Sequence, residues 1–344
     1  MTLSVWAGMG RYSRRRFLQG SLTMAGFGVL SGCGLVPLGG RQPTKVPRLG
    51  FLAPGSREGR GPFIDGLLQG LGELGYVDGQ NVSIEYRFAG TDDDRLPALA
   101  AELVDLKVDV IVASATLASI AAKQTTGTIP IVMGASSEPI ASGIVDSLAR
   151  PGGNVTGLSL MSWQVMGKRL ELLKAFIPDL ALVAMFTNVT NPVYLPQLEA
   201  LEAAARTLAI QVQRLDVRRA EDFEIGFQAA AARHAGALIV PADALITNNR
   251  VAIAGLAKRY RQPAIYEFRE FVELGGLLSY GANLRDLYRR AATYVDKILK
   301  GAKPADLPIE QPTKFDFAVN LTTAKELGIT FPEDVLIQIT EIIE

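Results

Sequence analysis

From Pro47 onward, short runs of β-branched and apolar residues alternate with longer segments of helical periodicity. The run Val108–Val112 is apolar apart from Asp109, and Ala237–Val240 is apolar throughout. Such runs are typical of strands that are buried on both faces of a parallel sheet. Strand–helix alternation implies right-handed βαβ units. The pattern therefore predicts an α/β protein with doubly wound parallel sheets.

The alternation occurs twice along the chain, which predicts two lobes of similar construction. The first set of predicted strands is Arg48–Ala53, Val82–Phe88, Val108–Ser114, Ile129–Gly134 and Val155–Leu160. The helices between them are predicted near Gly61–Leu74, Asp94–Leu106, Leu117–Gln124 and Pro139–Leu148. A helix at Trp163–Phe176 opens the second half, whose strands are Ala181–Thr187, Gln211–Asp216, Ala237–Pro241 and Ala264–Tyr266. Its further helices are predicted near Pro192–Leu208, Ala220–Arg233 and Ile246–Tyr260.

After the second half, Gly276–Gly281 is predicted to form one more strand, followed by the amphipathic helix Leu284–Leu299. A chain that leaves one α/β unit and returns to it forms discontinuous domains. Such a topology places a cleft where the chain crosses between the units.

The first 33 residues have the features of an export signal. Paired arginines at 14–16 stand directly before the uncharged run Phe17–Leu30, which is shorter than the roughly 20 apolar residues of a spanning helix. The order Ser-Arg-Arg-x-Phe-Leu resembles a twin-arginine signal, and the general export route stays open as an alternative. Leu30-Ser31-Gly32-Cys33 resembles a lipobox, in which the cysteine is lipidated.

Cys33 is the only cysteine of the 344 residues. A lone cysteine is ordinarily a buried core residue, but its place directly after the apolar run favours lipidation. Residues 34–46, with several prolines and glycines, are predicted to form a flexible tether. The sequence thus predicts a protein that is exported and held on the periplasmic or cell-surface face of a membrane by a lipid anchor.

The composition excludes several classes of function. With 35 Lys+Arg against 35 Asp+Glu, the chain lacks the excess of basic residues typical of a nucleic-acid-binding protein. One cysteine and one histidine, His234, leave little basis for a metal site or imidazole catalysis. The chain has no G-x-S-x-G nucleophile motif, and its G-x-G-x-x-G match at residues 70–75 ends a predicted helix instead of opening one. We expect no enzymatic activity, no cofactor and no metal.

Polar residues follow the ends of several predicted strands, where open α/β sheets bind ligands. These candidate ligand-binding residues are Ser56, Ser114, Thr116, Ser136, Ser137, Glu138, Asn188, Thr190, Asn191, Asp243, Tyr266 and Glu267. Hydroxyls and backbone N–H groups at a helix start suit a carboxylate, and we expect Ser114, Thr116, Ser136 and Ser137 to hold one. Asp243 and Glu267 are expected to face an ammonium group. Taken singly, each residue is more typical of a helix cap or a turn than of a ligand site.

Five segments of the sequence resemble one known family. They are Leu74–Asn81, Leu148–Gly157, Gly167–Lys174, Gly275–Gly281 and Leu307–Lys314. Together they are similar to the substrate-binding proteins of ABC transporters that include tryptophan- and tyrosine-binding proteins. The resemblance covers nearly all of residues 47–344.

The resemblance implies a type I periplasmic-binding fold with three crossings, near Gly157, Gly281 and Ile309–Pro312. It assigns residues 47–157 and 282–311 to lobe 1, and residues 158–281 and 312–344 to lobe 2. It also implies an amino-acid-like ligand, an ABC permease as partner and a monomeric state. The family often has a Gly-Asp-Pro-like turn where this chain has Ser137-Glu138-Pro139.

These observations predict an extracytoplasmic lipoprotein that captures a small ligand by hinge closure for an ABC importer. Two alternatives are a sensor that presents its closed state to a membrane signalling partner and an exported enzyme such as a hydrolase or racemase. The lack of a nucleophile motif argues against the enzyme.

Overall fold

The computed structural model describes residues 45–344, and these residues form one compact unit. The predicted export signal, Cys33 and almost all of the predicted tether lie outside the described residues. Within residues 45–344, none of the helices combines the length and apolar character needed to span a bilayer.

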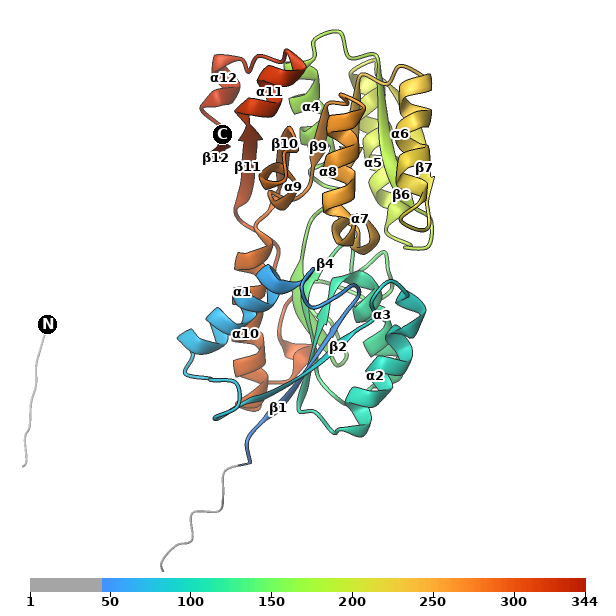
Figure 1. The fold of residues 1–344 in the computed structure, drawn as a ribbon. Coiled ribbons are helices and arrows are strands. Elements are labelled where there is room, and N and C mark those ends of the chain that lie inside the picture. The colour runs from blue at the N-terminus through green and yellow to red at the C-terminus, as the bar shows by residue number, and fades with distance from the viewer. Residues whose placement is uncertain (1–44) are drawn as a thin grey trace, which may run out of the picture. The chain divides into compact units, whose positions relative to one another are not determined.

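Lobe 1 is built on a parallel sheet that has five strands within the described residues, in the order β2-β1-β3-β4-β5. The strands are β1 (Arg48–Ala53), β2 (Ser83–Phe88), β3 (Val110–Ser114), β4 (Ile131–Ser136) and β5 (Val155–Ser159). The helices are α1 (Gly61–Glu73), α2 (Leu96–Asp105), α3 (Ala115–Thr125) and α10 (Leu284–Leu299). Helices α1 and α10 pack against each other, and α2 packs against α3 (Figure 1).

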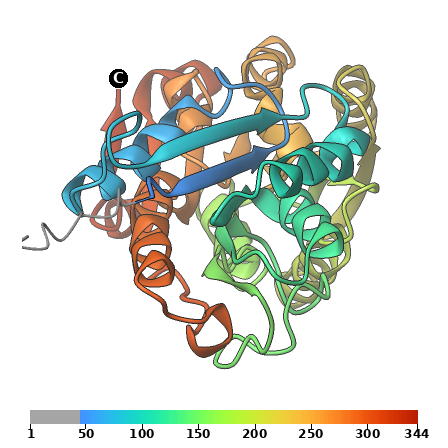
Figure 2. The same ribbon diagram turned by 90° about the horizontal axis from the view of Figure 1, so that it is seen from below.

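Helices cover both faces of this sheet, as the apolar strands predict. Phe51 of β1 and Val112 of β3 pack with side chains of α1 and α10, whereas Leu52 and Ala113 pack with those of α2 and α3. Neighbouring residues of a strand point to opposite faces, so both must be apolar when both faces are covered. Seen from below, α10 lies on one side of the sheet, and α2 and α3 lie on the other (Figure 2).

Lobe 2 is built on a sheet that has seven strands within the described residues, in the order β12-β11-β10-β9-β8-β6-β7. The strands are β6 (Leu182–Asn188), β7 (Gln211–Val217), β8 (Ala237–Val240), β9 (Ala264–Tyr266), β10 (Leu278–Ala282), β11 (Phe315–Asn320) and β12 (Glu341–Ile343). The longer helices are α4 (Met166–Phe176), α5 (Tyr194–Thr207), α6 (Asp222–Ala232) and α8 (Arg250–Arg259). Strand β11 is antiparallel to β10, because the chain re-enters lobe 2 from lobe 1 at that point.

The chain passes between the two sheets at three places. Strand β5 ends lobe 1 at Ser159, and α4 already packs on lobe 2. The second passage joins β10 to α10. The third passage begins after Glu310, which pairs with Leu158 of β5. From there the chain leads into β11. Both lobes are therefore assembled from segments that are distant in sequence.

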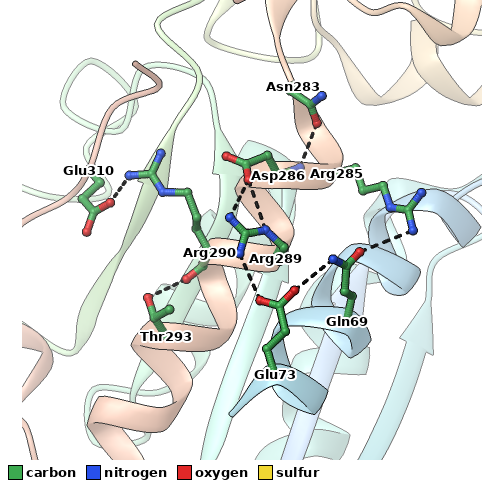
Figure 3. A network of polar contacts seen from close by, with 9 residues as sticks. All are labelled: Gln69, Glu73, Asn283, Arg285, Asp286, Arg289, Arg290, Thr293 and Glu310. Carbon is green, nitrogen blue, oxygen red and sulfur yellow. Dashed lines mark hydrogen bonds and ion pairs between the residues drawn. The ribbon is translucent and has the colours of Figure 1, made fainter. Parts of the chain in front are cut away.

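Helix α10 is bound on two sides by ion pairs (Figure 3). Arg289 contacts Glu73 of α1 at 3.0 Å, and Arg290 forms a short ion pair with Glu310 of the third crossing. Tyr294 adds a hydrogen bond of 2.7 Å to the carbonyl oxygen of Pro308. The helix thus connects the outer face of lobe 1 to the segment that leads back into lobe 2.

The structure confirms the predicted fold class but corrects parts of the element prediction. The helix expected at Pro139–Leu148 is absent from this part of the described chain, which forms turns instead. Gly143 adopts a left-handed conformation there (φ 66°), and the N–H groups of Ile144 and Val145 both bond back to Pro139. Ile144 and Val145 are nevertheless buried, so the apolar pattern that suggested a helix reflects burial alone.

Two further differences concern lobe 2. The single helix expected at Ile246–Tyr260 is divided at Asn249 into α7 (Ala244–Asn248) and α8. The last 33 residues, for which no elements were predicted, form β11, α11 (Leu321–Leu327), α12 (Glu333–Leu336) and β12.

Candidate ligand-binding site

A cavity lies between the two lobes at the carboxyl ends of their parallel strands. The space between the side chains that line it measures about 460 Å³, counting the part that is open to solvent. Lobe 1 contributes Arg60, Phe63, Ala115, Thr116, Leu117, Ala135, Ser137, Leu284 and Tyr288, and Leu160 comes from the first crossing. Lobe 2 contributes Asn191, Ala242, Asp243, Ala244, Thr247 and Phe268.

The wall from lobe 1 is aromatic. The rings of Phe63 and Tyr288 stack with centroids 5.4 Å apart and an interplanar angle of 14°. The hydroxyl of Tyr288 forms a 2.5 Å hydrogen bond with Ser114, 174 residues away in sequence. A Cβ atom at Gly134 would lie 2.3 Å from the Tyr288 ring, so this glycine makes room for it. Ser114 therefore positions Tyr288 and does not line the cavity itself.

Three hydroxyls lie at the start of α3 and the end of β4. Thr116 donates to the carbonyl oxygen of Ser137 and accepts from its backbone N–H, at 3.2 and 3.1 Å. Ser136 donates to Thr116 at 3.3 Å and is fully buried. Thr116 and Ser137 line the cavity, whereas Ser136 supports them from behind.

On lobe 2, four hydrogen bonds hold the carboxylate of Asp243 in place. It accepts from the backbone N–H of Ile246 at 3.2 Å, which makes Asp243 the N-cap of α7. The amide of Asn188 donates to both of its oxygens at 3.1 Å, and that of Asn191 donates at 2.8 Å. Thr190 is exposed, and its N–H and hydroxyl both donate to the side-chain oxygen of Asn188. Asp243 and Asn191 thus face the cavity, with Asn188 behind them.

The structure corrects the role expected for Glu267. Its carboxylate is fully buried, pairs with Arg169 at 3.1 Å, and accepts from Ser162 and from the backbone N–H of Ala242. Arg169 neutralises this carboxylate inside lobe 2, and Glu267 does not line the cavity, so it does not face a ligand amine. Its neighbour Tyr266 points to the opposite side of β9, as alternation along a strand requires, and stacks on Phe271.

Two other predicted residues lie outside the cavity lining. Ser56 is exposed, and its hydroxyl accepts from the backbone N–H of Gly59, as in a turn. Glu138 is buried next to the first crossing, with a left-handed backbone (φ 48°). Burial raises the pKa of Glu138 to about 7, although hydrogen bonds from Trp163 act in the opposite direction. It therefore gains and loses its proton near neutral pH.

The sequence prediction missed Arg60, Phe63, Thr247, Phe268 and Tyr288. Arg60 had a detectable signal, because it stands directly before the helix predicted to follow the first strand. The aromatic residues had none, because amphipathic helices carry aromatic side chains in any protein core. Among residues 45–344, no three His, Cys, Asp or Glu side chains are grouped as a metal site requires.

The lobes touch at the rim of the cavity. Arg250 of lobe 2 donates to the carbonyl oxygen of Gly59 in lobe 1 at 3.3 Å. A Cβ atom at Gly55 of lobe 1 would lie 2.3 Å from the side chain of Asn248 in lobe 2. The lobes are therefore closed over the cavity.

Comparison with known proteins agrees with this arrangement. A tyrosine-binding protein of Clostridioides difficile is 27% identical to the chain over 264 residues, which cover 77% of this chain and 76% of the relative. A crystal structure from Streptococcus pneumoniae, described as an ABC domain in complex with L-Trp, is 27% identical with a TM-score of 0.80, over 86% of this chain and all of that one.

A third relative differs in its conformation. A substrate-binding protein with adhesive properties from Clostridium difficile, solved in a ligand-free, open state, is also 27% identical and covers 87% of this chain and 99% of its own. Its TM-score is only 0.64. At equal identity, the present arrangement is thus nearer to the ligand-bound relative than to the open one.

The family resemblance read from the sequence is confirmed by the family comparison. The model of the family named ABC transporter substrate binding protein matches residues 51–343, which span both lobes and all three crossings. The chain belongs to the ABC transporter substrate-binding protein family.

Proposed function

We propose that this protein captures a free amino acid with an aromatic side chain in the interlobe cavity and delivers it to an ABC permease for import. One observation carries the proposal: the cavity combines aromatic rings with fixed polar groups, and both lobes supply both kinds. The names of two relatives, one tyrosine-binding and one in complex with L-Trp, support the ligand class.

The aromatic part of the ligand has apolar partners on both sides. Phe63 and Tyr288 of lobe 1 offer stacked rings, and Phe268 of lobe 2 lines the same space. Aromatic pairs contribute roughly 0.5–1.5 kcal/mol beyond the area they bury. A ligand ring between these side chains gains contacts with both lobes only when the lobes are closed.

The polar part of the ligand is held in the same way. Thr116 and Ser137 of lobe 1 and Asn191, Asp243 and Thr247 of lobe 2 present hydroxyl, amide and carboxylate groups to one cavity. Asp243 is oriented to receive the ligand ammonium. A ligand that bridges both lobes has a higher affinity for the closed state and shifts the population toward it. In this proposal, binding energy favours closure and no bond of the ligand is broken.

The location of the protein follows from its first 33 residues. We propose that Cys33 is lipidated after export and that residues 34–46 connect the anchor to the folded unit. Two acyl chains are sufficient for stable attachment to a membrane. A change of Cys33 to Ser should move the protein from the membrane fraction to the soluble fraction, and fatty-acid labelling of the natural protein should be lost in the variant.

The binding proposal is tested by calorimetric titration of the purified protein with all common amino acids. We expect saturable binding of tyrosine, tryptophan or phenylalanine, and recovery of the unchanged ligand afterwards. Phe63→Ala should weaken this binding, whereas Ile225→Ala, a change at an exposed residue on α6, should not. Absence of binding by all three aromatic amino acids would contradict the proposed ligand class.

A further inference from the structure

Arg60 is a buried cation without an anionic partner among residues 45–344. Only 4% of the residue is exposed, and its Nε donates to the carbonyl oxygen of Pro54 at 3.0 Å. Its Nη2 atom is buried and has no hydrogen-bond partner among the described residues. None of the ion pairs within residues 45–344 includes Arg60, although its guanidinium lies 5.7 Å from the centroid of the Phe63 ring.

The electrostatic surroundings agree with an uncompensated charge. Burial is the largest influence on Arg60 and lowers the pKa of its guanidinium, while Asp93, Asp243 and Tyr288 act in the opposite direction. Arginine remains protonated in proteins, so its buried charge is costly until an anion approaches. Asp93 and Asp243 are not within ion-pair distance of Arg60, and the cavity lies between Arg60 and Asp243.

A second group suited to an anion lines the same cavity. The first turn of α3, residues 115–117, faces it. The side chain of Ser114, at the N-cap position, makes no capping hydrogen bond, because its hydroxyl is bonded to Tyr288. The N–H groups of an uncapped first turn carry a partial positive charge and bind anions readily.

We propose that Arg60 is the carboxylate anchor of the site, with the first turn of α3 completing the anion pocket in lobe 1. This inference rests on the proposed function and adds to it. The ligand then spans the cavity with opposite charges, its carboxylate at Arg60 and its ammonium at Asp243 of the other lobe. Amines and amides that lack the carboxylate are discriminated against.

This assignment changes the roles expected from the sequence. Ser114 and Ser136, which were expected to hold the acid group, have their hydroxyls bonded to Tyr288 and Thr116 respectively. They support the walls of the pocket, and the charge that recognises the carboxylate comes from Arg60.

The test compares L-tyrosine with L-tyrosinamide by calorimetry, at a pH that keeps the amide's amino group protonated. We expect the natural protein to bind tyrosine about 10- to 100-fold more tightly, as for a hydrogen bond to a charged group. Arg60→Gln should remove most of this difference. Arg57→Gln is the matched control, because Arg57 is exposed, lies over the Tyr86 ring at 4.2 Å and does not line the cavity.

A structural role for Arg60 would weaken both ligands equally and leave the ratio of their affinities unchanged, which would overturn the inference with the proposed function intact. If Arg60→Gln does not fold, Arg60→Lys keeps the charge but not the planar fork, and it should lower the ratio in the same direction. An unchanged ratio in Arg60→Lys would then overturn the inference.

If the proposed function is wrong, the natural protein binds no aromatic amino acid. The carboxylate anchor is then tested by thermal melting with phenylacetate and phenylacetamide. A rise in melting temperature with phenylacetate alone, absent in Arg60→Gln, would support the anchor. No rise, or an equal rise with both compounds, would overturn it.

Discussion

The Nη2 atom of Arg169 lies 3.1 Å from Oε2 of Glu267, and both side chains are fully excluded from solvent. Arg169 also donates to two carbonyl oxygens. One belongs to Tyr280 in β10, just before the second crossing, and the other to Ser162 in the first crossing. Ser162 in turn donates to Glu267 at 2.6 Å. One buried ion pair therefore joins two of the crossings to the loop that carries Ala242 into the cavity.

Breaking this pair should strongly destabilise the protein. Glu267→Gln leaves Arg169 as a buried charge without its anion, which costs about 3–5 kcal/mol of unfolding free energy. Urea denaturation of the purified variant measures this loss. A suitable comparison is Arg259→Ala, which removes an exposed ion pair with Glu224 and should cost at most about 1 kcal/mol. Similar losses in the two variants would contradict a special role for the buried pair.

Glu138 should make stability depend on pH. Its pKa in the folded protein is about 7, raised by burial from the ordinary 4.5. A raised carboxyl pKa means that the folded state binds the proton more tightly than the unfolded state. The proton on Glu138 therefore stabilises the folded state in full below pH 4.5, and this stabilisation is lost as the pH rises through about 7.

The measurement is the free energy of unfolding between these two pH values, for the natural protein and for Glu138→Gln. We expect a decrease with a slope approaching about 1.4 kcal/mol per pH unit from this group, which the variant lacks. Trp163 and Glu267 are the neighbours that act on Glu138, and neither changes in the variant. Parallel curves for the two proteins would refute the assignment.

Gly157 in β5 should not tolerate a side chain. Its φ is 127°, and an added Cβ would lie 2.3 Å from the carbonyl oxygen of Met133 on the neighbouring strand β4. Gly157→Ala should lower the free energy of unfolding by about 2–4 kcal/mol, through backbone strain and the clash. Gly72→Ala is the control, because Gly72 is exposed in α1 with open space around it and should gain roughly 0.5–1 kcal/mol.

Asp243→Ala should affect both stability and binding. Loss of the α7 cap costs about 0.5–2 kcal/mol, and loss of the anion should weaken binding of an amino acid at least about tenfold. Asn320→Ala is the control, because Asn320 is the N-cap of α11 and does not line the cavity. Its side-chain oxygen accepts from the backbone N–H of Thr323 at 2.8 Å. We expect the same loss of stability there with unchanged affinity. Unchanged affinity in Asp243→Ala as well would remove Asp243 from the site.

Local sequence patterns were sufficient for the architecture. Continuous apolar runs such as Ala237–Val240 are typical of strands buried on both faces, so the two doubly wound sheets could be predicted without any contact being known. The pattern failed at residues 139–148, where Pro139 and Gly143 favour turns although Ile144 and Val145 are buried. Periodicity reports burial, and only backbone geometry decides between a helix and a series of turns.

The candidate site residues were also predicted correctly in part and incorrectly in part. Thr116, Ser137, Asn191 and Asp243 were predicted from their place after strands, and all four line the cavity, because the carboxyl ends of parallel strands lie at one edge. Whether they bind the ligand remains a prediction. The sequence could not distinguish them from Ser114 or Glu267, which bond to Tyr288 and Arg169 and do not line the cavity.

The sequence by itself therefore determined the two α/β lobes and the edges at which they offer polar groups, because periodicity and strand ends are local properties. The tertiary structure alone decided which of those groups line the cavity. Glu267 is neutralised by Arg169 of helix α4, whereas the Nη2 atom of Arg60 is buried with no partner among the described residues. Both outcomes depend on side chains brought together from distant parts of the chain, and no local pattern contains that information.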